Sequence, residues 1–292
     1  MTSVLVAGGS RDPNLITILE ALRMRNVQIL PLLVEAGNNP SLSWELDTGV
    51  ITLNGNPLNC SGVFIRRDVF HDGGSDGDYR ASAWFTVIQG WLAISPQVRV
   101  LNRPYIGRHT NKLHVLRLAQ SAGLPIPATT ITNDISRIKF QSGVTDFVAK
   151  PVTGGGYCQS LDTLLSETQL QEGIAATPAI VQCKLAGPDV RIYAIDNTFL
   201  GFRIYADKID YRESRNRNIE PMDQLPVKIM QGLKRLMTTM GLNWCAADFK
   251  LDPKNGQLIF LEINSNPMFS VFDKVAQGQI TDAIVGFLTN KS

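Results

Sequence analysis

The chain has 292 residues, enough for more than one hydrophobic core, and this length predicts two or three domains. Hydrophobic residues make up 44% and charged residues 18%, as in ordinary globular proteins, and a formal net charge of +2 gives no electrostatic case for binding nucleic acid or a membrane. The four cysteines are scattered without metal-ligand spacing, and we find neither a signal peptide nor a membrane-spanning apolar run, so we expect a cytoplasmic protein without disulfides or zinc.

The N-terminal part of the chain alternates strand and helix patterns, which predicts a parallel sheet. The expected strands are 1–8, 27–34, 63–65 and 98–101, and the expected helices follow Gly9 and span 81–94. Gly8 and Gly9 stand at the first strand-to-helix turn. Because the full GxGxxG pattern is missing, we interpret them as a tight turn and not as a dinucleotide site.

The rest of the chain predicts further strands and helices. A helix starts near Thr110, which can cap it, and stops at Gly123. A strand at 144–150 follows, then strands at 180–185, 190–195 and 199–205, a charged irregular stretch at 207–223, a helix at 226–240, a strand hairpin and a C-terminal helix.

A lysine followed by a glycine-rich loop indicates phosphate binding. Lys150 ends its strand, and Thr153, Gly154, Gly155 and Gly156 come directly after. Glycines allow backbone N–H groups to approach a polyphosphate, and the lysine supplies a positive charge. The Walker pattern GxxxxGK[ST] is absent, and the same residues alone also fit a flexible surface hairpin with a solvated lysine.

The predicted hairpin at 248–264 brings oxygen ligands to one face. If its turn centres on Asn255, Asp248 lies opposite Glu262, and Asn264 falls on the same face. The other face would pair Ile259, Leu261 and Ile263 with Leu251, Phe249 and Ala247. Carboxylate and carbonyl oxygens are the ligands that Mg²⁺ prefers, so the hairpin predicts a magnesium-nucleotide site. A half-exposed hairpin with its polar side outward is the alternative.

The order of these features resembles the ATP-grasp superfamily. A lysine in a helix, a lysine with a glycine loop, a linker strand, the pattern D-x-R and the pattern D…E-x-N follow one another over roughly residues 100–275. The likeness is closest to the branch of RimK-type glutamate ligases and peptide-modifying graspetide ligases. It implies an α/β (α+β) ATP-grasp fold: a Rossmann-like pre-ATP-grasp domain at 1–104, and two α+β subdomains at 105–184 and 185–292 that sandwich ATP.

The resemblance also implies roles for particular residues. Lys112 and Lys150 match phosphate-contacting lysines, Thr153 to Gly156 match the loop over the triphosphate, and Arg191 matches the arginine of G-x-D-x-R. The remaining matches are Gln182, Cys183, Lys184 and Leu185 for adenine, Asp189 for ribose, and Asp248, Glu262 and Asn264 for Mg²⁺ or Mn²⁺. Without the resemblance, Lys112 is simply a solvated lysine and 182–185 an ordinary edge strand.

The acceptor side departs from the family pattern, because 207–223 lacks the expected glycine pair. We assign Arg203 to the transferred phosphate and the tetrahedral intermediate, although it equally fits a strand arginine paired with an acid. Asn216 and Arg215 are predicted to contact the substrate. Arg215 forms a basic cluster with Arg212 and Arg217, which either orders over an anionic substrate or is simply solvated. Arg66 and Arg67 follow a strand of the first domain, so they either hold a substrate carboxylate or acidic peptide, or form a solvated pair.

The predicted function is an ATP-dependent carboxylate–amine ligase. An amino acid or peptide carboxylate would become an acyl phosphate and then an amide, with release of ADP and phosphate. Alternatives are a graspetide-type macrocyclase that forms ester or amide links, and a non-catalytic ATP-binding regulator, which would not need the full metal triad. A purine-type kinase or a carboxylase is also compatible with these motifs. The expected partners are ATP, a carboxylate substrate and an amine acceptor, with no nucleic acid or membrane, and the resemblance implies a homodimer.

Overall fold

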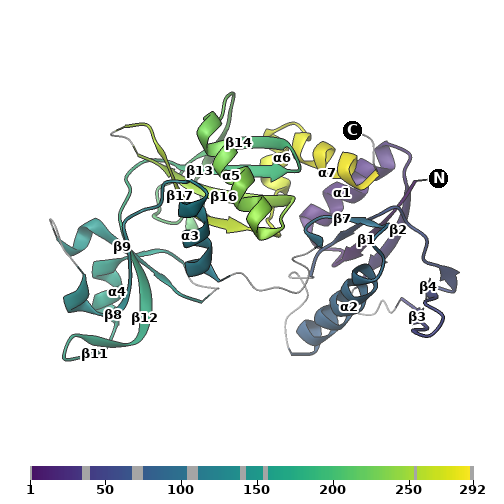
Figure 1. The fold of residues 1–292 in the computed structure, drawn as a ribbon, viewed down its shortest axis with the longest axis horizontal. Coiled ribbons are helices and arrows are strands. Elements are labelled where there is room, and N and C mark those ends of the chain that lie inside the picture. The colour runs from purple at the N-terminus through teal and green to yellow at the C-terminus, as the bar shows by residue number, and fades with distance from the viewer. Residues whose placement is uncertain are drawn as a thin grey trace.

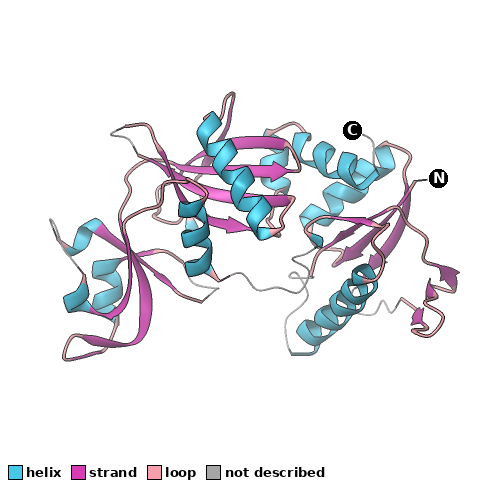
Figure 2. Ribbon diagram, viewed as in Figure 1, coloured by secondary structure: helices cyan, strands magenta, loops and turns pink. Residues whose placement is uncertain are grey.

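The computed structural model describes residues 2–34, 40–67, 75–103, 111–138, 143–153, 157–252 and 255–289. The chain folds into three blocks that lie in a row, each built on one main β-sheet (Figure 1). The block with the N-terminus lies at one end, the block from the middle of the sequence lies at the other, and the sheet of the C-terminal part lies between them. Helices lie against these sheets (Figure 2), so the architecture is the mixed α/β one that the sequence predicts.

The N-terminal block has a four-stranded parallel sheet in the order β2-β1-β6-β7. Its strands are β1 (Ser3–Gly8), β2 (Gln28–Leu33), β6 (Gly62–Ile65) and β7 (Arg99–Val100). Helix α1 (Pro13–Met24) is capped by Asp12 and packs on one face, and α2 (Ser75–Ala93) packs on the other. A small sheet of β3 (Leu42–Trp44), β4 (Ile51–Leu53) and β5 (Asn56–Pro57), which the sequence did not predict, shares the core under α2.

The middle of the chain forms an antiparallel sheet in which β12 (Ile174–Cys183) pairs with β9 (Phe147–Pro151) and with β8 (Thr129–Asp134). The strands β10 (Gln159–Ser160) and β11 (Leu170–Gln171) extend it. Helix α4 (Leu161–Glu167) packs on this sheet through a small core that includes Phe147, Leu161 and Val181. Two short 3₁₀ turns, η2 (Ile135–Arg137) and η3 (Val144–Asp146), precede β9, so the strand expected from Val144 begins three residues later.

The third sheet is antiparallel, in the order β15-β14-β13-β16-β17. Its strands are β13 (Asp189–Ile195), β14 (Thr198–Tyr205), β15 (Asn218–Met222), β16 (Trp244–Leu251) and β17 (Leu258–Asn264). Helices α3 (Lys112–Ser121) and α5 (Val227–Met240) cover one face, where Val190 and Ile192 are buried. The segment 207–223 was expected to be irregular, but it contains the turn η4 (Tyr211–Glu213) and β15.

The first and third sheets share a hydrophobic core. Helices α6 (Ser270–Val275) and α7 (Gln279–Thr289) lie with α1 between the two sheets, and Tyr193 of β13 belongs to the same core as Val4 of β1. The contact between α7 and β6 is close, because a Cβ at Gly62 would lie 2.4 Å from the Leu288 carbonyl oxygen. The C-terminal part of the chain therefore packs closely against the N-terminal block.

Three details bear on the predictions. Helix α3 is capped by Asn111, whereas the predicted cap, Thr110, lies outside the described residues. This helix packs on the third sheet although it precedes residue 184, and the division of the chain at 104 and 184 stays a proposal. Within the described ranges, no helix is both long and apolar enough to cross a membrane.

Candidate active site

A cleft lies where the middle sheet faces the third sheet. Its larger cavity has a volume of about 600 Å³. A second cavity of about 460 Å³ shares Lys112, Lys150 and Glu262 with the first, so these side chains stand between the two. The predicted residues that line the larger cavity are Lys112, Lys150, Gln182, Cys183, Lys184, Leu185, Asp189, Asp248 and Glu262. Asn264 lines the second cavity.

The β16–β17 hairpin supplies the candidate metal ligands. Asp248 pairs with Glu262, as the sequence predicts, and Asn264 lies two residues further along β17. The ladder then shifts between Asp248 and Phe249, which leaves Leu261 as an extra residue of a β-bulge. Between this bulge and the turn, the predicted core face was wrong. Phe260, and not Leu261, lies opposite Phe249, and Leu261 lines both cavities.

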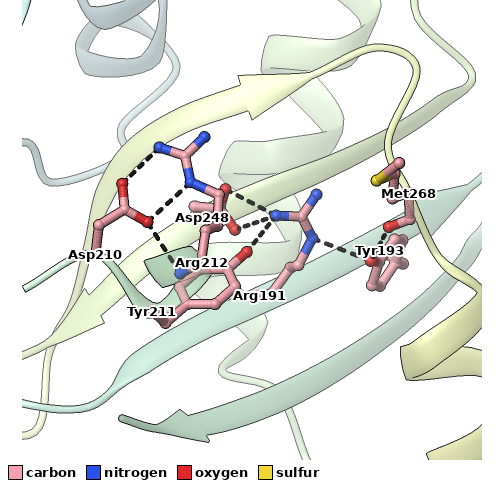
Figure 3. Close-up of polar contacts among 7 residues, drawn as sticks. All are labelled: Arg191, Tyr193, Asp210, Tyr211, Arg212, Asp248 and Met268. Atoms are coloured by element: carbon pink, nitrogen blue, oxygen red, sulfur yellow. Dashed lines mark hydrogen bonds and ion pairs between the residues drawn. The ribbon is translucent and has the colours of Figure 1, made fainter. Parts of the chain in front are cut away.

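Arg191 lies beside Asp248, as its partner on the neighbouring strand β13 (Figure 3). Its Nη1 donates to both Asp248 carboxylate oxygens, at 3.0 and 3.1 Å, and to the Tyr211 hydroxyl at 2.6 Å. Its Nε donates to the Tyr193 hydroxyl at 3.0 Å, and that hydroxyl donates to the Met268 carbonyl oxygen at 2.6 Å. Arg191 is buried, so it orients the carboxylate from behind the cavity wall.

The electrostatics of this pair suit a cation in the cleft. Burial raises the pKa of Asp248, Arg191 opposes this shift, and the nearby Glu262 carboxylate adds to it. Burial lowers the pKa of Arg191, but Asp248 and the two tyrosines outweigh burial, so the guanidinium stays charged. The proximity of Glu262 helps to raise the pKa of Asp248, and a divalent cation bound between the two carboxylates would offset this repulsion.

The linker between the two sheets runs along one wall of the cleft. Gln182 is buried, and its Nε2 donates to the Thr129 hydroxyl at 3.0 Å. Its Oε1 is buried at the cavity wall, and no described residue is its hydrogen-bond partner. A buried acceptor without a partner costs free energy unless a ligand supplies a donor, so Gln182 indicates a ligand with an N–H or O–H group at this point.

The pattern G-x-D-x-R has a structural basis at the end of this linker. A Cβ at Gly187 would lie 1.6 Å from the Leu251 carbonyl oxygen, so only glycine fits there. Asp189 follows at the start of β13, opposite Lys250, whose Nζ donates to the Asp189 carboxylate at 2.9 Å. Burial raises the pKa of Asp189, and Lys250 opposes that shift. The residue predicted to hold ribose is thus already paired with a lysine on the cavity wall.

One arginine that the role assignments omitted reaches the cleft. Arg212 lines both cavities, and Asp210 holds its guanidinium by bonds of 2.8 Å from Nε and 2.6 Å from Nη2 (Figure 3). The guanidinium also lies 5.4 Å from the ring centre of Tyr157, which comes from the other side of the cleft. Hydrogen bonding to Asp210 raises the pKa of Arg212, and Glu262 contributes to the same shift. Arg212 is therefore a cation beside the candidate metal ligands.

Comparisons with known proteins agree with this geometry. No family model matches the chain. A probable alpha-L-glutamate ligase 2 of Shewanella frigidimarina (strain NCIMB 400) is 25% identical over 207 residues, which cover 64% of this chain and 67% of the relative. The ATP-grasp ligase PsnB, solved with a minimal precursor, is 27% identical with a TM-score of 0.76 and covers 98% of this chain and 99% of PsnB. The chain belongs to the ATP-grasp superfamily.

Two further structures match this ATP-grasp chain along nearly its whole length. PsnB with a phosphomimetic variant of the minimal precursor, Mg and ADP is 26% identical with a TM-score of 0.78, over 98% of this chain and 99% of the other. The macrocyclase MdnC of Microcystis aeruginosa MRC, bound with the precursor peptide MdnA, is 22% identical with a TM-score of 0.75, over 99% of this chain and 100% of MdnC. At that identity MdnC supports the fold alone.

Arg203 is not at the ATP-grasp cleft. It pairs with Val190 on β13 and with Glu220 on β15, so it lies on the face of the third sheet that α3 and α5 cover. Arg191 pairs with Phe202, on the cleft side. The structure therefore contradicts the prediction that Arg203 reaches the transferred phosphate.

The predicted substrate residues also lie away from the two cavities. Arg66 is buried and bonded to Asp12, which contradicts a direct role in holding a substrate carboxylate, whereas Arg67 is exposed. Arg215 and Asn216 are exposed and line neither cavity. Of the predicted glycine loop, Thr153 is exposed and lines neither cavity, and Gly154, Gly155 and Gly156 lie outside the described residues.

Sequence reasoning missed several residues that build the site. Tyr193 follows Arg191 at the two-residue spacing of a strand face, and this spacing could have indicated it. Lys250 and Leu261 depend on the pairing register of β16, and Tyr211 and Arg212 on the path of the charged segment. The sequence placed Leu261 on the core face of the hairpin and Arg212 in a basic cluster, and nothing in the local sequence distinguishes Lys250 and Tyr211 from solvated surface residues.

Proposed function

We propose that the protein is a peptide-modifying ligase that activates a side-chain carboxylate of a peptide with ATP and joins it to an amine of that peptide. The observation that carries the proposal is the similarity to PsnB, a ligase solved with a precursor, over 98% of this chain. The glutamate ligase matches over only 64% of it. Both relatives are ligases by name, and PsnB is an ATP-grasp ligase.

The cleft offers groups for each part of ATP. The unpartnered Gln182 Oε1 could accept a hydrogen bond from the adenine amino group. Lys112 and Lys150 stand where the two cavities meet, at the right place to neutralise a phosphate chain. A cavity of about 600 Å³ lies within the range of nucleotide-sized sites. These observations support ATP as the ligand of this cleft.

The donor set on the hairpin fits Mg²⁺. Among the described residues, no group of three or more His, Cys, Asp or Glu side chains is arranged to hold a metal ion. The candidate site consists of two carboxylates, Asp248 and Glu262, and the amide oxygen of Asn264, and Mg²⁺ would take phosphate oxygens and water as its remaining ligands. When bound, Mg²⁺ would neutralise the developing charge of the transferred phosphate.

The chemistry proceeds in two balanced steps. An oxygen of the substrate carboxylate attacks the γ-phosphorus, the bond to the bridging oxygen breaks, and ADP leaves. An amine then attacks the acyl carbon of the acyl phosphate, phosphate leaves with the former carboxylate oxygen, and the amine loses a proton to solvent. Lys150 and Lys112 stabilise the phosphate charge, and Arg212, held by Asp210 next to Glu262, takes the role first assigned to Arg203.

A substrate comparison tests the proposal. We would measure ADP release with pools of synthetic peptides that combine acidic residues with lysine, and in parallel with the same amino acids in free form. The proposal predicts that only peptides stimulate ADP release and that the product has lost one water for each bond formed, by mass spectrometry. Stimulation by free amino acids alone, with a condensed amino-acid product, would contradict it.

The glutamate ligase supports a second candidate, the addition of a free amino acid to a carboxylate. The same experiment separates the two functions, because addition increases the mass of the acceptor whereas an internal link decreases it. An ester link to a serine or threonine would lose water in the same way as an amide. Treatment with hydroxylamine cleaves esters and leaves amides intact, so it distinguishes the two kinds of link.

A further inference from the structure

The segment 265–270, which directly follows the candidate metal ligand Asn264, is held by side chains of the N-terminal block. Asn102 Nδ2 donates to the Ser265 carbonyl oxygen at 2.7 Å. Asn14 Oδ1 accepts from the backbone N–H groups of Phe269 and Ser270 at 2.6 and 2.9 Å. The segment is therefore fixed at both ends from the N-terminal block.

Arg66 holds the centre of the segment. Its Nη1 donates to Asn266 Oδ1 at 2.9 Å and to the Pro267 carbonyl oxygen at 3.0 Å. Its Nε donates to Asp12 Oδ2 at 2.5 Å, and Asp12 Oδ1 accepts from the backbone and side-chain nitrogens of Asn14. Arg66, Asp12 and Asn14 are all buried, at 5%, 0% and 0% exposure. A buried network of this kind is rigid because each bond fixes the orientation of the next group.

The network reaches the metal ligand through one residue. The backbone N–H of Asn266 donates to Asn264 Oδ1 at 2.9 Å, and the side chain of the same Asn266 accepts from Arg66. The position of Asn266 thus sets the direction of the Asn264 amide oxygen. Outer partners that orient a metal ligand commonly change metal affinity by about 10- to 100-fold.

We propose that Arg66 is a positioning residue for the metal site: through Asn266 it holds the Asn264 amide oxygen in place for a divalent cation. The N-terminal block thereby belongs to the metal site, although the three candidate ligands Asp248, Glu262 and Asn264 all lie on the β16–β17 hairpin. This inference rests on the proposed role of Asn264 as a ligand. It also explains why an arginine that lies away from both cavities is buried together with its counter-ion, Asp12.

The test measures two affinities of the 292-residue protein by titration calorimetry: that for Mn²⁺ in the presence of ADP, and that for ADP in the absence of metal. Arg66→Lys keeps the charge next to Asp12. A lysine has a single ammonium group in place of the planar guanidinium, so it cannot donate to Asp12, Asn266 and Pro267 at once. We expect about a tenfold loss of Mn²⁺ affinity with unchanged affinity for metal-free ADP. Asn266→Ala removes the side-chain acceptor of Arg66 at an exposed position and should give the same pattern.

Two controls complete the design. Arg25→Lys alters another arginine of the N-terminal block, one that pairs with Asp282 on α7, and should change neither affinity. Asn264→Ala tests the ligand itself. The positioning role is overturned if Asn264→Ala weakens Mn²⁺ binding but Arg66→Lys and Asn266→Ala, both folded, do not. It is also overturned if Arg66→Lys and Asn266→Ala weaken the binding of metal-free ADP as much as that of Mn²⁺. If Asn264→Ala itself has no effect, the proposed metal site fails, and the positioning role fails with it.

Discussion

Replacing Arg191 by methionine should destabilise the fold by about 3 kcal/mol near neutral pH. The side chains of Arg191 and Asp248 are only 8% and 13% exposed, and one guanidinium nitrogen contacts both carboxylate oxygens. Removing one partner of such a buried pair leaves an uncompensated charge, which costs about 3–5 kcal/mol. We expect the lower end of that range because Asp248 borders the cleft, where water can reach it.

The loss should depend on pH. Burial raises the pKa of Asp248 and Arg191 opposes that shift, so the pKa rises further in the variant. A carboxyl group whose pKa is higher in the folded than in the unfolded state contributes stability that is full below the unfolded pKa and is lost as pH rises through the folded pKa. The deficit of the variant should therefore be largest at about pH 8 and shrink towards about pH 5.

Urea unfolding followed by tryptophan fluorescence measures this deficit. Trp244 stacks on Tyr193, with ring centres 5.9 Å apart, and so reports on this region. Arg25→Met is the matched control, because it breaks an ion pair with Asp282 in which the side chains are 39% and 60% exposed, and it should cost no more than about 1 kcal/mol at either pH. A deficit for Arg191→Met below about 1 kcal/mol, or one equal at both pH values, would refute the reasoning.

Three further substitutions test other parts of the site. Gly187→Ala should destabilise the protein by more than about 2 kcal/mol, because its Cβ would lie 1.6 Å from a backbone oxygen, whereas Gly90→Ala, with 3.5 Å to the nearest atom, should leave the melting temperature nearly unchanged or higher. Gln182→Met should raise the KM for ATP about tenfold and abolish any preference for ATP over ITP, which lacks the amino group; a retained preference would exclude the adenine contact. Arg212→Met should lower kcat about a hundredfold and Arg203→Met hardly at all, and the opposite order would restore the original assignment of Arg203.

The parts of the site that follow from local sequence were predictable. The prediction that Asp248 pairs with Glu262 is confirmed, but the turn alone does not set this pair. The register nearest the turn pairs Phe249 with Phe260 and would place Asp248 opposite Leu261, and the bulge shifts it to Glu262. The bulge at Leu261 was not predictable, since the strand pattern of the hairpin continues without a break. As a result, the sequence indicated the metal ligands but assigned the neighbouring leucine to the core.

Arg203 shows how one register decides a role. The turn at Asp196 and Asn197 joins β13 and β14 with two residues, and this short turn places Arg203 opposite Val190. Recognition of that hairpin would have assigned Arg203 to the helix-covered face from the sequence alone. The position of Arg191, in contrast, was predicted correctly, since the strand pattern and the family resemblance both favour the cleft side.

Neither strand register nor family resemblance could have predicted the role of Arg66. Its partners Asn266 and Pro267 are some 200 residues away, and they meet it only because α1, α6 and α7 bring the first and third sheets together. A pair of arginines after a strand fits a ligand site and a structural network equally well. Only the packing of the blocks distinguishes the two interpretations: it buries Arg66 and leaves Arg67 exposed.

Transfer of a labelled oxygen tests the central claim most directly. A stimulating peptide whose carboxylates carry oxygen-18 would be incubated with ATP, Mg²⁺ and the protein, and the products analysed by ³¹P NMR. The account predicts ADP and phosphate, with one labelled oxygen in the phosphate for each bond formed, because the carboxylate attacks the γ-phosphorus. AMP with pyrophosphate, or phosphate without the label, would contradict an acyl-phosphate ligase.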